Sequence, residues 1–226
     1  MSRTSILSRV RAGILRKGAS DLARRRSVAE WMSAPPPHPR PALARMEGSE
    51  RLARFKSCLE QQGTAIITVD SLSALPAAVT AFLSSLGGTP HLVIGDDDRL
   101  ATLAWPNELV PQLWRPGETL GDGTAALTHA VAGVAETGTL ILTSRAASPA
   151  SLAFLPEVHL VALAEADILA SFEETFARLR ADVGARRFPR AVNMISGASR
   201  TGDIGGKIVK GAHGPRRLAV FIYAES

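Results

Sequence analysis

Short, uninterrupted apolar runs recur along this chain and alternate with stretches of helical periodicity. Thr64–Val69 and Val158–Leu163 have the length and composition of buried strands, and glycines such as Gly63 and Gly87 end the helical stretches between the runs. Strands that are apolar on both faces and are joined by helices are typical of a parallel sheet. The sequence therefore predicts an α/β fold, with a mainly parallel sheet covered by helices on both faces.

The boundaries of the predicted elements follow from capping residues and from the apolar runs. The predicted strands are Thr64–Val69, His91–Ile94, Thr139–Thr143, Val158–Leu163, Val192–Ile195 and Leu218–Tyr223. The predicted helices begin near Ser49, at Ser71 or Ser73, after the acidic run Asp96–Asp98, and near Glu165, from where the last one extends to Val183. The segment after Ser199 is also expected to begin a helix.

A proline-rich segment, Ala34–Pro41, divides the chain, since proline lacks the amide hydrogen and restricts its predecessor. Before it, Ile6, Val10 and Ile14 share one face of a predicted amphipathic helix, and arginines occupy the other face. We interpret residues 1–41 as a helical arm with its linker and residues 42–226 as the α/β domain. An arginine-rich start is also typical of organelle transit peptides, but we favour an arm that packs on the body or on another subunit.

The cysteine and histidine content excludes several classes of site. Cys58 is the single cysteine, so this chain alone builds no disulfide framework and no cysteine-ligated zinc or iron–sulfur site. The five histidines are scattered, and we expect no metal and no cofactor in this chain. No apolar run approaches the roughly 18 residues that span a bilayer. A single thiol fits a reducing compartment, so we expect a cytoplasmic protein.

Positive charge is concentrated in two zones. Residues 1–47 carry ten basic and three acidic residues, and residues 185–217 carry eight basic residues and one acidic residue, although the formal net charge of the chain is only +5. An acidic middle between two basic zones argues against a nucleic-acid-binding protein with a wholly basic surface. The segment Gly202–Lys207 does not match a P-loop, because its spacing differs and Ile208 follows the lysine.

The first candidate site is the segment Ser196–Asp203, which follows a predicted strand. Gly197 permits a turn, Ser199 and Thr201 supply hydroxyls, and Arg200 favours an anion together with the free amides of a following helix. Ligands of open α/β sheets bind beyond the carboxyl ends of the strands, where this segment is expected to lie. Alternatively, Ser199 only caps a helix and Arg200 pairs with Asp203.

Two further segments carry candidate residues. The turn Gly211–Pro215 contains Gly214 and His213, which is either a proton donor or acceptor, or a partner of the backbone. Glu136 precedes a buried strand and acts either as a base or nucleophile, or as a partner that holds Arg200 or loop amides in place. Thr128, eight residues before Glu136, is a candidate lining residue.

Several segments together resemble one protein family. In chain order, SILSRVRAGI, AETGTLIL, the LP-x-x-H segment Leu155–His159 and ISGASRTGDI…KGAHGPRRLAVFI are similar to the LUD-domain family, and within it to the lactate-utilization protein C group. The resemblance implies a sugar-phosphate isomerase/CoA-transferase-like α/β fold. It also implies a role in a bacterial three-protein system that oxidises L-lactate to pyruvate, in which cysteine-rich partner proteins carry the iron–sulfur clusters.

The resemblance also selects site residues. The positions that match the family pattern are Glu136, Thr137, Gly197, Ser199, Arg200, Thr201, Asp203, Gly211, His213 and Gly214. The chain departs from that pattern at Ala198, where proline is usual, at Gly202, where alanine is usual, and at Gly205–Gly206, where an acidic residue is usual. The added glycines predict a looser loop, because glycine gains backbone entropy in the unfolded chain.

Three functional hypotheses follow. The first is an accessory or substrate-handling subunit of an iron–sulfur L-lactate oxidation system, which binds a small carboxylate or phosphate with Arg200 as its charge partner. The second is a stand-alone enzyme of the isomerase or CoA-transferase type that uses Glu136. The third is a non-catalytic assembly subunit whose arm docks on acidic partner proteins.

Overall fold

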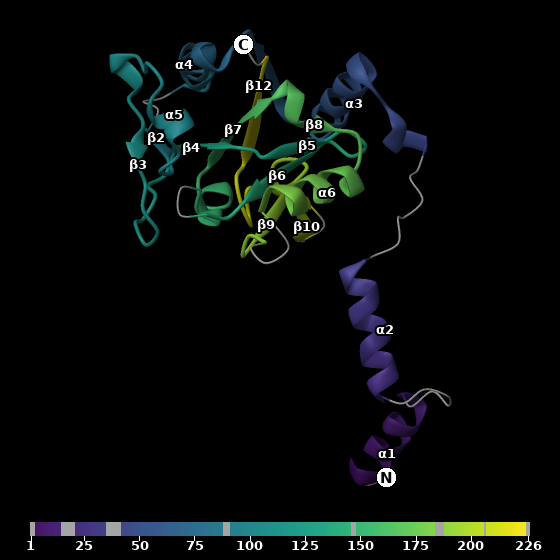
Figure 1. Ribbon diagram of the computed structural model, residues 1–226. Helices are drawn as coiled ribbons and strands as arrows, with labels where there is room; N and C mark the ends of the chain where they lie inside the picture. Colours follow the sequence, from purple (N-terminus) through teal and green to yellow (C-terminus); the bar gives the residue numbers. More distant parts are fainter. Residues whose placement is uncertain are drawn as a thin grey trace. The chain divides into compact units, whose positions relative to one another are not determined.

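A six-stranded parallel sheet forms the centre of the body (Figure 1). Its strand order is β1-β12-β7-β4-β2-β3, and every pair of neighbours is parallel. The strands are β1 (Ala65–Val69), β2 (His91–Ile94), β3 (Gln112–Leu113), β4 (Thr124–His129), β7 (Val158–Ala164) and β12 (Arg217–Tyr223). The predicted mainly parallel α/β fold is confirmed, and β3 and β4 are additions to the predicted strands.

The computed structural model describes residues 3–14, 21–34, 42–87, 91–145, 148–183, 188–205 and 207–224. The chain forms two compact units, Met1–Pro39 and Arg40–Ser226. The first contains α1 (Arg3–Ile14), which was predicted, and α2 (Asp21–Ser33), which was not. Residues 35–41 of the predicted linker lie outside the described residues.

A second, mixed sheet has the order β8-β5-β6-β9. It consists of β5 (Ala132–Val134), β6 (Thr139–Thr143), β8 (Ile168–Leu169) and β9 (Val192–Ile195), in which β6 is antiparallel to both β5 and β9. The strands predicted at 139–143 and 192–195 are therefore present, but they belong to this sheet and not to the parallel one. A separate antiparallel hairpin follows, formed by β10 (Arg200–Ile204) and β11 (Lys207–Lys210).

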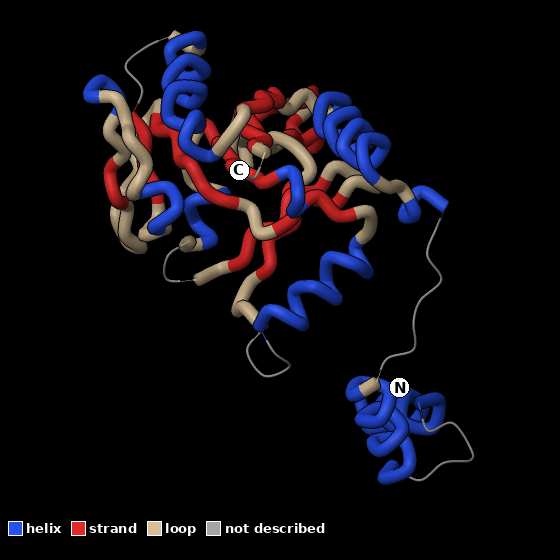
Figure 2. The backbone as a smooth tube through the Cα atoms, turned by 45° about the horizontal axis from the view of Figure 1, so that its top comes forward, coloured by secondary structure: helices blue, strands red, loops and turns tan. Residues whose placement is uncertain are grey.

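Helices cover both faces of the parallel sheet (Figure 2). On one face, α4 (Leu75–Ser85) and α5 (Asp98–Ala101) share a buried cluster with the sheet through residues such as Leu83 and Leu100. On the other face, α3 (Gly48–Gln61) packs together with the mixed sheet, and Phe55 and Leu59 are fully buried there. The outer side of the mixed sheet is covered by α6 (Phe172–Val183).

The last predicted helix begins later than expected. Residues Glu165–Asp167 form a short 3-10 turn, and Ile168 and Leu169 then pair with β5 as β8. The α-helix starts only at Phe172. Pairing with a distant strand thus outweighs the local helical tendency of this segment.

Substitution of Gly138 is expected to destabilise the body. Gly138 has φ +65°, and a Cβ atom there would lie 2.5 Å from Cys58 Cβ and 3.0 Å from the backbone nitrogen of Leu59 in α3. Gly138→Ala should lower the free energy of unfolding by about 2–4 kcal/mol, since the left-handed backbone and the close approach of a helix both penalise a side chain. Urea denaturation measures the change. Gly202→Ala is the control, because φ there is not positive and no atom lies within 4 Å of the added Cβ; equal losses in both variants would contradict this explanation.

Candidate functional site

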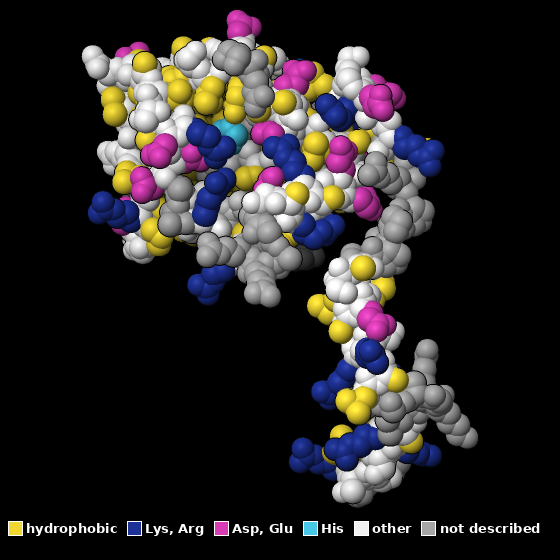
Figure 3. Space-filling view, in the orientation of Figure 1, with side chains coloured by type: hydrophobic (Ala, Val, Ile, Leu, Met, Phe, Trp, Pro, Cys, Tyr) yellow, Lys and Arg dark blue, Asp and Glu magenta, His cyan; other side chains and the backbone are white. Residues whose placement is uncertain are grey.

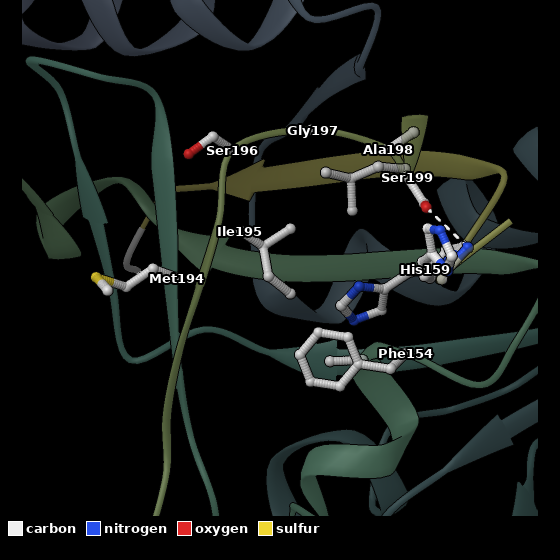
Figure 4. A pocket seen from close by; sticks show the side chains of 13 residues that line it. Phe154, His159, Met194, Ile195, Ser196, Gly197, Ala198 and Ser199 are labelled. Carbon is white, nitrogen blue, oxygen red and sulfur yellow. Dashed lines mark hydrogen bonds between the residues drawn. The ribbon is translucent and has the colours of Figure 1, made fainter. Parts of the chain in front are cut away.

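A cavity of about 190 Å³ lies where the end of β9 meets the starts of β7 and β12. Its walls are the segment 194–199, the turn 213–215, and the side chains of Ala153, Phe154, His159 and Leu218. Figure 4 shows Phe154 and His159 beneath the Ile195–Ser199 segment. Apolar side chains form most of the wall, and the polar groups come from two histidines, two serines and the backbone.

The position of this cavity corrects one premise of the sequence analysis. The segment after Val192–Ile195 was expected beyond the carboxyl ends of the parallel strands. However, β9 belongs to the mixed sheet, and its end lies at the amino ends of β7 and β12. The cavity is therefore on the opposite edge of the parallel sheet from the one where α/β ligand sites are usually found.

Backbone hydrogen bonds join the two predicted loops. The Ser199 amide donates to the Pro215 carbonyl at 2.9 Å, and the Gly211 amide donates to the Ser199 carbonyl at 2.9 Å. The His213 amide also donates to Ser199 Oγ at 3.3 Å. These bonds bring Ser199 and the pair His213–Gly214, which begins 14 residues later in the chain, to one wall of the cavity.

His159 is the polar side chain of the cavity that lies deepest in the body. It is 1% exposed, and its Nε2 atom lies 2.8 Å from Thr128 Oγ1. Burial lowers the pKa of His159 to about 3, so the imidazole is neutral at physiological pH. Its Nδ1 atom is buried and has no hydrogen-bond partner in the described part of the chain. A buried ring nitrogen without a partner is unusual and indicates a place for a ligand or a water molecule.

Three residues of the cavity wall have backbone amides without a partner among the described residues. They are Gly197, Ala198 and Gly214. Gly197 also packs against the end of α3, where an added Cβ would lie 2.9 Å from Gln62 Cβ. Unpaired amides beside a neutral histidine suit an acceptor group such as a carboxylate.

Arg200, Thr201 and Asp203 are not among the residues that line this cavity. They lie on β10, which replaces the helix expected after Ser199. The β-branched residues of this segment favour a strand, and Gly205, with φ +61°, permits the turn into β11. Arg200 Nη2 donates to the Gln62 carbonyl at 2.6 Å, Thr201 is buried, and the side chain of Asp203 lies outside the described residues.

Glu136 and Thr137 also lie outside the cavity wall. Glu136 Oε1 accepts a hydrogen bond at 3.0 Å from the amide of Phe172, the first residue of α6. A carboxylate at that place stabilises the start of the helix. This contact corresponds to the alternative in which Glu136 holds a backbone amide in place. Thr137 reaches the cavity only indirectly, since its hydroxyl contacts that of Thr139 at 2.7 Å and Thr139 contacts Ser196 at 2.8 Å.

A second buried polar cluster lies at the carboxyl ends of the parallel strands. His129 Nδ1 donates to the Ala130 carbonyl at 2.8 Å, so in the neutral ring Nε2 accepts from the Tyr223 hydroxyl at 2.7 Å. Ala162 and Ala164 of β7 pair with these two residues and leave space above that strand. Burial and the nearby Arg99 charge lower the pKa of His129 to about 4.

Beside this cluster, Asp97 and Arg99 form a bidentate ion pair, with nitrogen–oxygen distances of 2.9 and 2.6 Å. Burial acts to raise the pKa of Asp97, but the hydrogen bonds and charge of Arg99 outweigh it and hold that pKa below 3.8. Nothing in the sequence pattern singled out this cluster, because its polar members come from three separate segments, 97–99, 129 and 223. Among the described residues, no group of three or more His, Cys, Asp or Glu side chains is placed to hold a metal ion. No helix in the described part of the chain has the length and apolar character needed to cross a membrane.

Comparison with known proteins relates the chain to one family. Residues 118–223 match the family model described as the LUD domain. A lactate utilization protein C from Deinococcus radiodurans is 30% identical over 191 residues, which cover 83% of this chain and 85% of that protein. Another protein of that name, from Geobacillus kaustophilus, is 23% identical over 174 residues, covering 70% and 72%. A crystal structure of a DUF162 family protein from D. radiodurans has a similar fold, with a TM-score of 0.58 and 24% identity over 79% of this chain and 99% of that one.

The two buried histidines predict a loss of stability in mild acid. Both are neutral in the folded state, with pKa values of about 4 for His129 and about 3 for His159, against 6.5 for an unperturbed side chain. Below pH 6.5 the unfolded chain binds protons that the folded chain excludes, so the free energy of unfolding falls with pH until each folded-state pKa is passed. Between pH 7 and pH 5 we expect a loss of about 2 kcal/mol for each histidine.

Urea denaturation at the two pH values measures this loss. His129→Gln and His159→Gln should each remove about half of the combined loss of unfolding free energy between pH 7 and pH 5, whatever their effect on stability at neutral pH. The exposed His91→Gln is the matched control. An undiminished loss in both variants would contradict the assignment.

Proposed function

Since this chain belongs to the LUD-domain family, we propose that it serves in lactate utilisation as a subunit that handles the substrate and not the electrons. The names of its relatives from D. radiodurans and G. kaustophilus support the pathway. The single cysteine supports the division of labour, because an electron relay of iron–sulfur clusters needs several thiolates per cluster. The proposed partners are therefore cysteine-rich iron–sulfur proteins, and the proposed location is the cytoplasm.

The proposed ligand is a small 2-hydroxy or 2-oxo acid such as L-lactate or pyruvate, bound in the cavity beside His159. A volume of about 190 Å³ suits a ligand of a few heavy atoms, since drug-sized ligands occupy pockets of roughly 300–1,000 Å³. The free amides of Gly197, Ala198 and Gly214 are donors for the carboxylate. Phe154 and Leu218 offer an apolar wall for the methyl group. The observation that most strongly supports a ligand here is the buried Nδ1 of His159, which has no hydrogen-bond partner among the described residues.

The neutral imidazole of His159 suits both members of this redox pair. When Nε2 donates its hydrogen to Thr128 Oγ1, Nδ1 is an acceptor for the hydroxyl of a 2-hydroxy acid. When the Thr128 hydroxyl donates to Nε2, Nδ1 carries the hydrogen and donates to the oxygen of a 2-oxo acid. A change of tautomer therefore accommodates substrate and product without charging the cavity.

Arg200 was the expected charge partner of the ligand, and its role as such stays a prediction. Its guanidinium donates to the carbonyl at the end of α3, outside the cavity wall. The reading of Glu136 as the base of a stand-alone enzyme gains no support from its contact with the start of α6. We therefore propose no reaction that depends on Glu136.

Titration calorimetry of the intact chain with L-lactate and with pyruvate tests the proposed ligand. His159→Gln should weaken the affinity by about tenfold or more, because one buried hydrogen bond to the ligand is lost. Thr128→Val should impair the two acids unequally, because it removes the partner that lets the ring change tautomer. His91→Gln, at an exposed histidine outside the cavity wall, is the matched control. No binding of either acid at millimolar concentrations, or equal affinity in His159→Gln, would overturn the proposal.

A second candidate function, assembly through the N-terminal arm, is favoured by the surface of its two helices. Four apolar side chains of α2 are more than half exposed: Leu22 (80%), Val28 (56%), Trp31 (55%) and Met32 (70%). Figure 3 shows hydrophobic side chains interleaved with Lys and Arg along this unit. An apolar surface set among arginines is suited to a partner surface that is apolar and acidic.

Substitutions on α2 test this second function. Val28→Ser together with Trp31→Ser should abolish co-purification with the cysteine-rich partners and leave the binding of L-lactate to the body unchanged. Ala29→Ser, on the same exposed helix, is the control for an added hydroxyl. Unaltered co-purification of the double variant would exclude a docking role for this surface.

A further inference from the structure

We propose that the body has a second ligand site, a basic groove that takes a phosphate ester with a planar or apolar group. The groove has a volume of about 570 Å³, three times that of the cavity beside His159. It lies between the end of α4, the hairpin strand β11 and the amino ends of β1 and β12. This proposal is independent of the lactate ligand.

The charges on the groove have one sign. Lys210, Arg216 and Arg217 line it, and none of its lining residues is acidic. Arg216 Nη1 lies 3.6 Å from Glu157 Oε1, in a pair that is largely open to solvent. Lys210 and Arg217 have no ion pair within the described part of the chain. Three clustered cations, two of them without a carboxylate partner, favour a ligand that carries more than one negative charge.

Arg200 extends this basic surface. Gly63 lines the groove, and a Cβ atom built on Gly63 would collide with Arg200 Nη2. The guanidinium thus passes directly over this glycine on its way to the Gln62 carbonyl. The arginine that the sequence analysis singled out for an anion therefore lies at the edge of the groove and not in the smaller cavity.

Apolar side chains form the rest of the groove. Phe82 of α4 and Leu86, which directly follows that helix, lie on one side, and Ile208 of β11, which is 75% exposed, lies on the other. The Phe82 ring is held edge-on against Phe221, with 6.0 Å between ring centroids. A bare inorganic anion would leave these apolar surfaces in water, whereas a phosphate ester with a planar group covers them.

The size and the charge together narrow the ligand class. A small carboxylate such as lactate fills only part of the groove and offers one charge to three cations. A diphosphate ester matches both the number of cations and the apolar surface. The sequence has no P-loop, so the phosphates of the proposed ligand would bind to basic side chains and not to a ring of backbone amides.

Titration of the intact chain with ADP, inorganic pyrophosphate and adenosine tests the proposal, with ADP as the probe of the class. ADP should bind more tightly than pyrophosphate, and adenosine most weakly. Lys210→Gln and Arg217→Gln should each weaken ADP binding by about tenfold and reduce its dependence on salt. Ile208→Ser should weaken the binding of ADP but not that of pyrophosphate.

Lys207→Gln is the matched control, since Lys207 lies on the same strand and loses the same charge but does not line the groove. His159→Gln should leave ADP binding unchanged, which separates this site from the proposed lactate cavity. Equal weakening by Lys207→Gln and Lys210→Gln would reduce the effect to general electrostatic attraction and overturn the proposal. If pyrophosphate bound as tightly as ADP, the assignment of the ligand as a phosphate ester would be overturned. If none of the probes bound saturably, the proposal of a ligand site in this groove would be overturned.

Discussion

The burial of β7 on both faces is the constraint on which the rest of the body depends. All seven residues of Val158–Ala164 are buried, between β4 on one side and β12 on the other. A strand in this position accepts a polar side chain only where a partner compensates for the loss of water. His159, with its contact to Thr128, is that exception at the amino end. At the opposite end, the two alanines of β7 leave the space in which a buried histidine and a tyrosine meet.

Most of the parallel sheet follows from the sequence because β1, β2, β7 and β12 are short runs of mainly apolar residues. β4 escapes this rule, since Thr124, Thr128 and His129 interrupt its apolar pattern and are buried only because distant strands enclose them. Ile168–Leu169 escapes it for a related reason, because a stretch with helical periodicity pairs with β5 instead. In both cases the decisive interaction joins residues far apart along the chain, which local periodicity does not register.

The candidate site was predictable in its composition and less so in its geometry. Gly211, Pro215 and Ser199 indicated a turn and a polar loop, and the structure does join them by backbone hydrogen bonds. Arg200 follows Ser199 directly, yet successive side chains of an extended chain point to opposite sides, so Ser199 lines the cavity whereas the guanidinium of Arg200 lies over Gly63. His159 was visible only as part of the LP-x-x-H pattern, and its importance depends on burial that no linear pattern reveals.

The position of β12 within the sheet has a consequence for how the body is made. β12 is the last strand of the parallel sheet in chain order, yet it lies between β1 and β7, and Ala65 pairs with Ala219. During translation, β1 is therefore synthesised long before its neighbour exists, and its edge and the apolar side of α3 stay open until β12 emerges from the ribosome. Such a nascent chain exposes an unpaired strand for most of its synthesis, and an unpaired apolar strand edge favours non-native pairing with other chains.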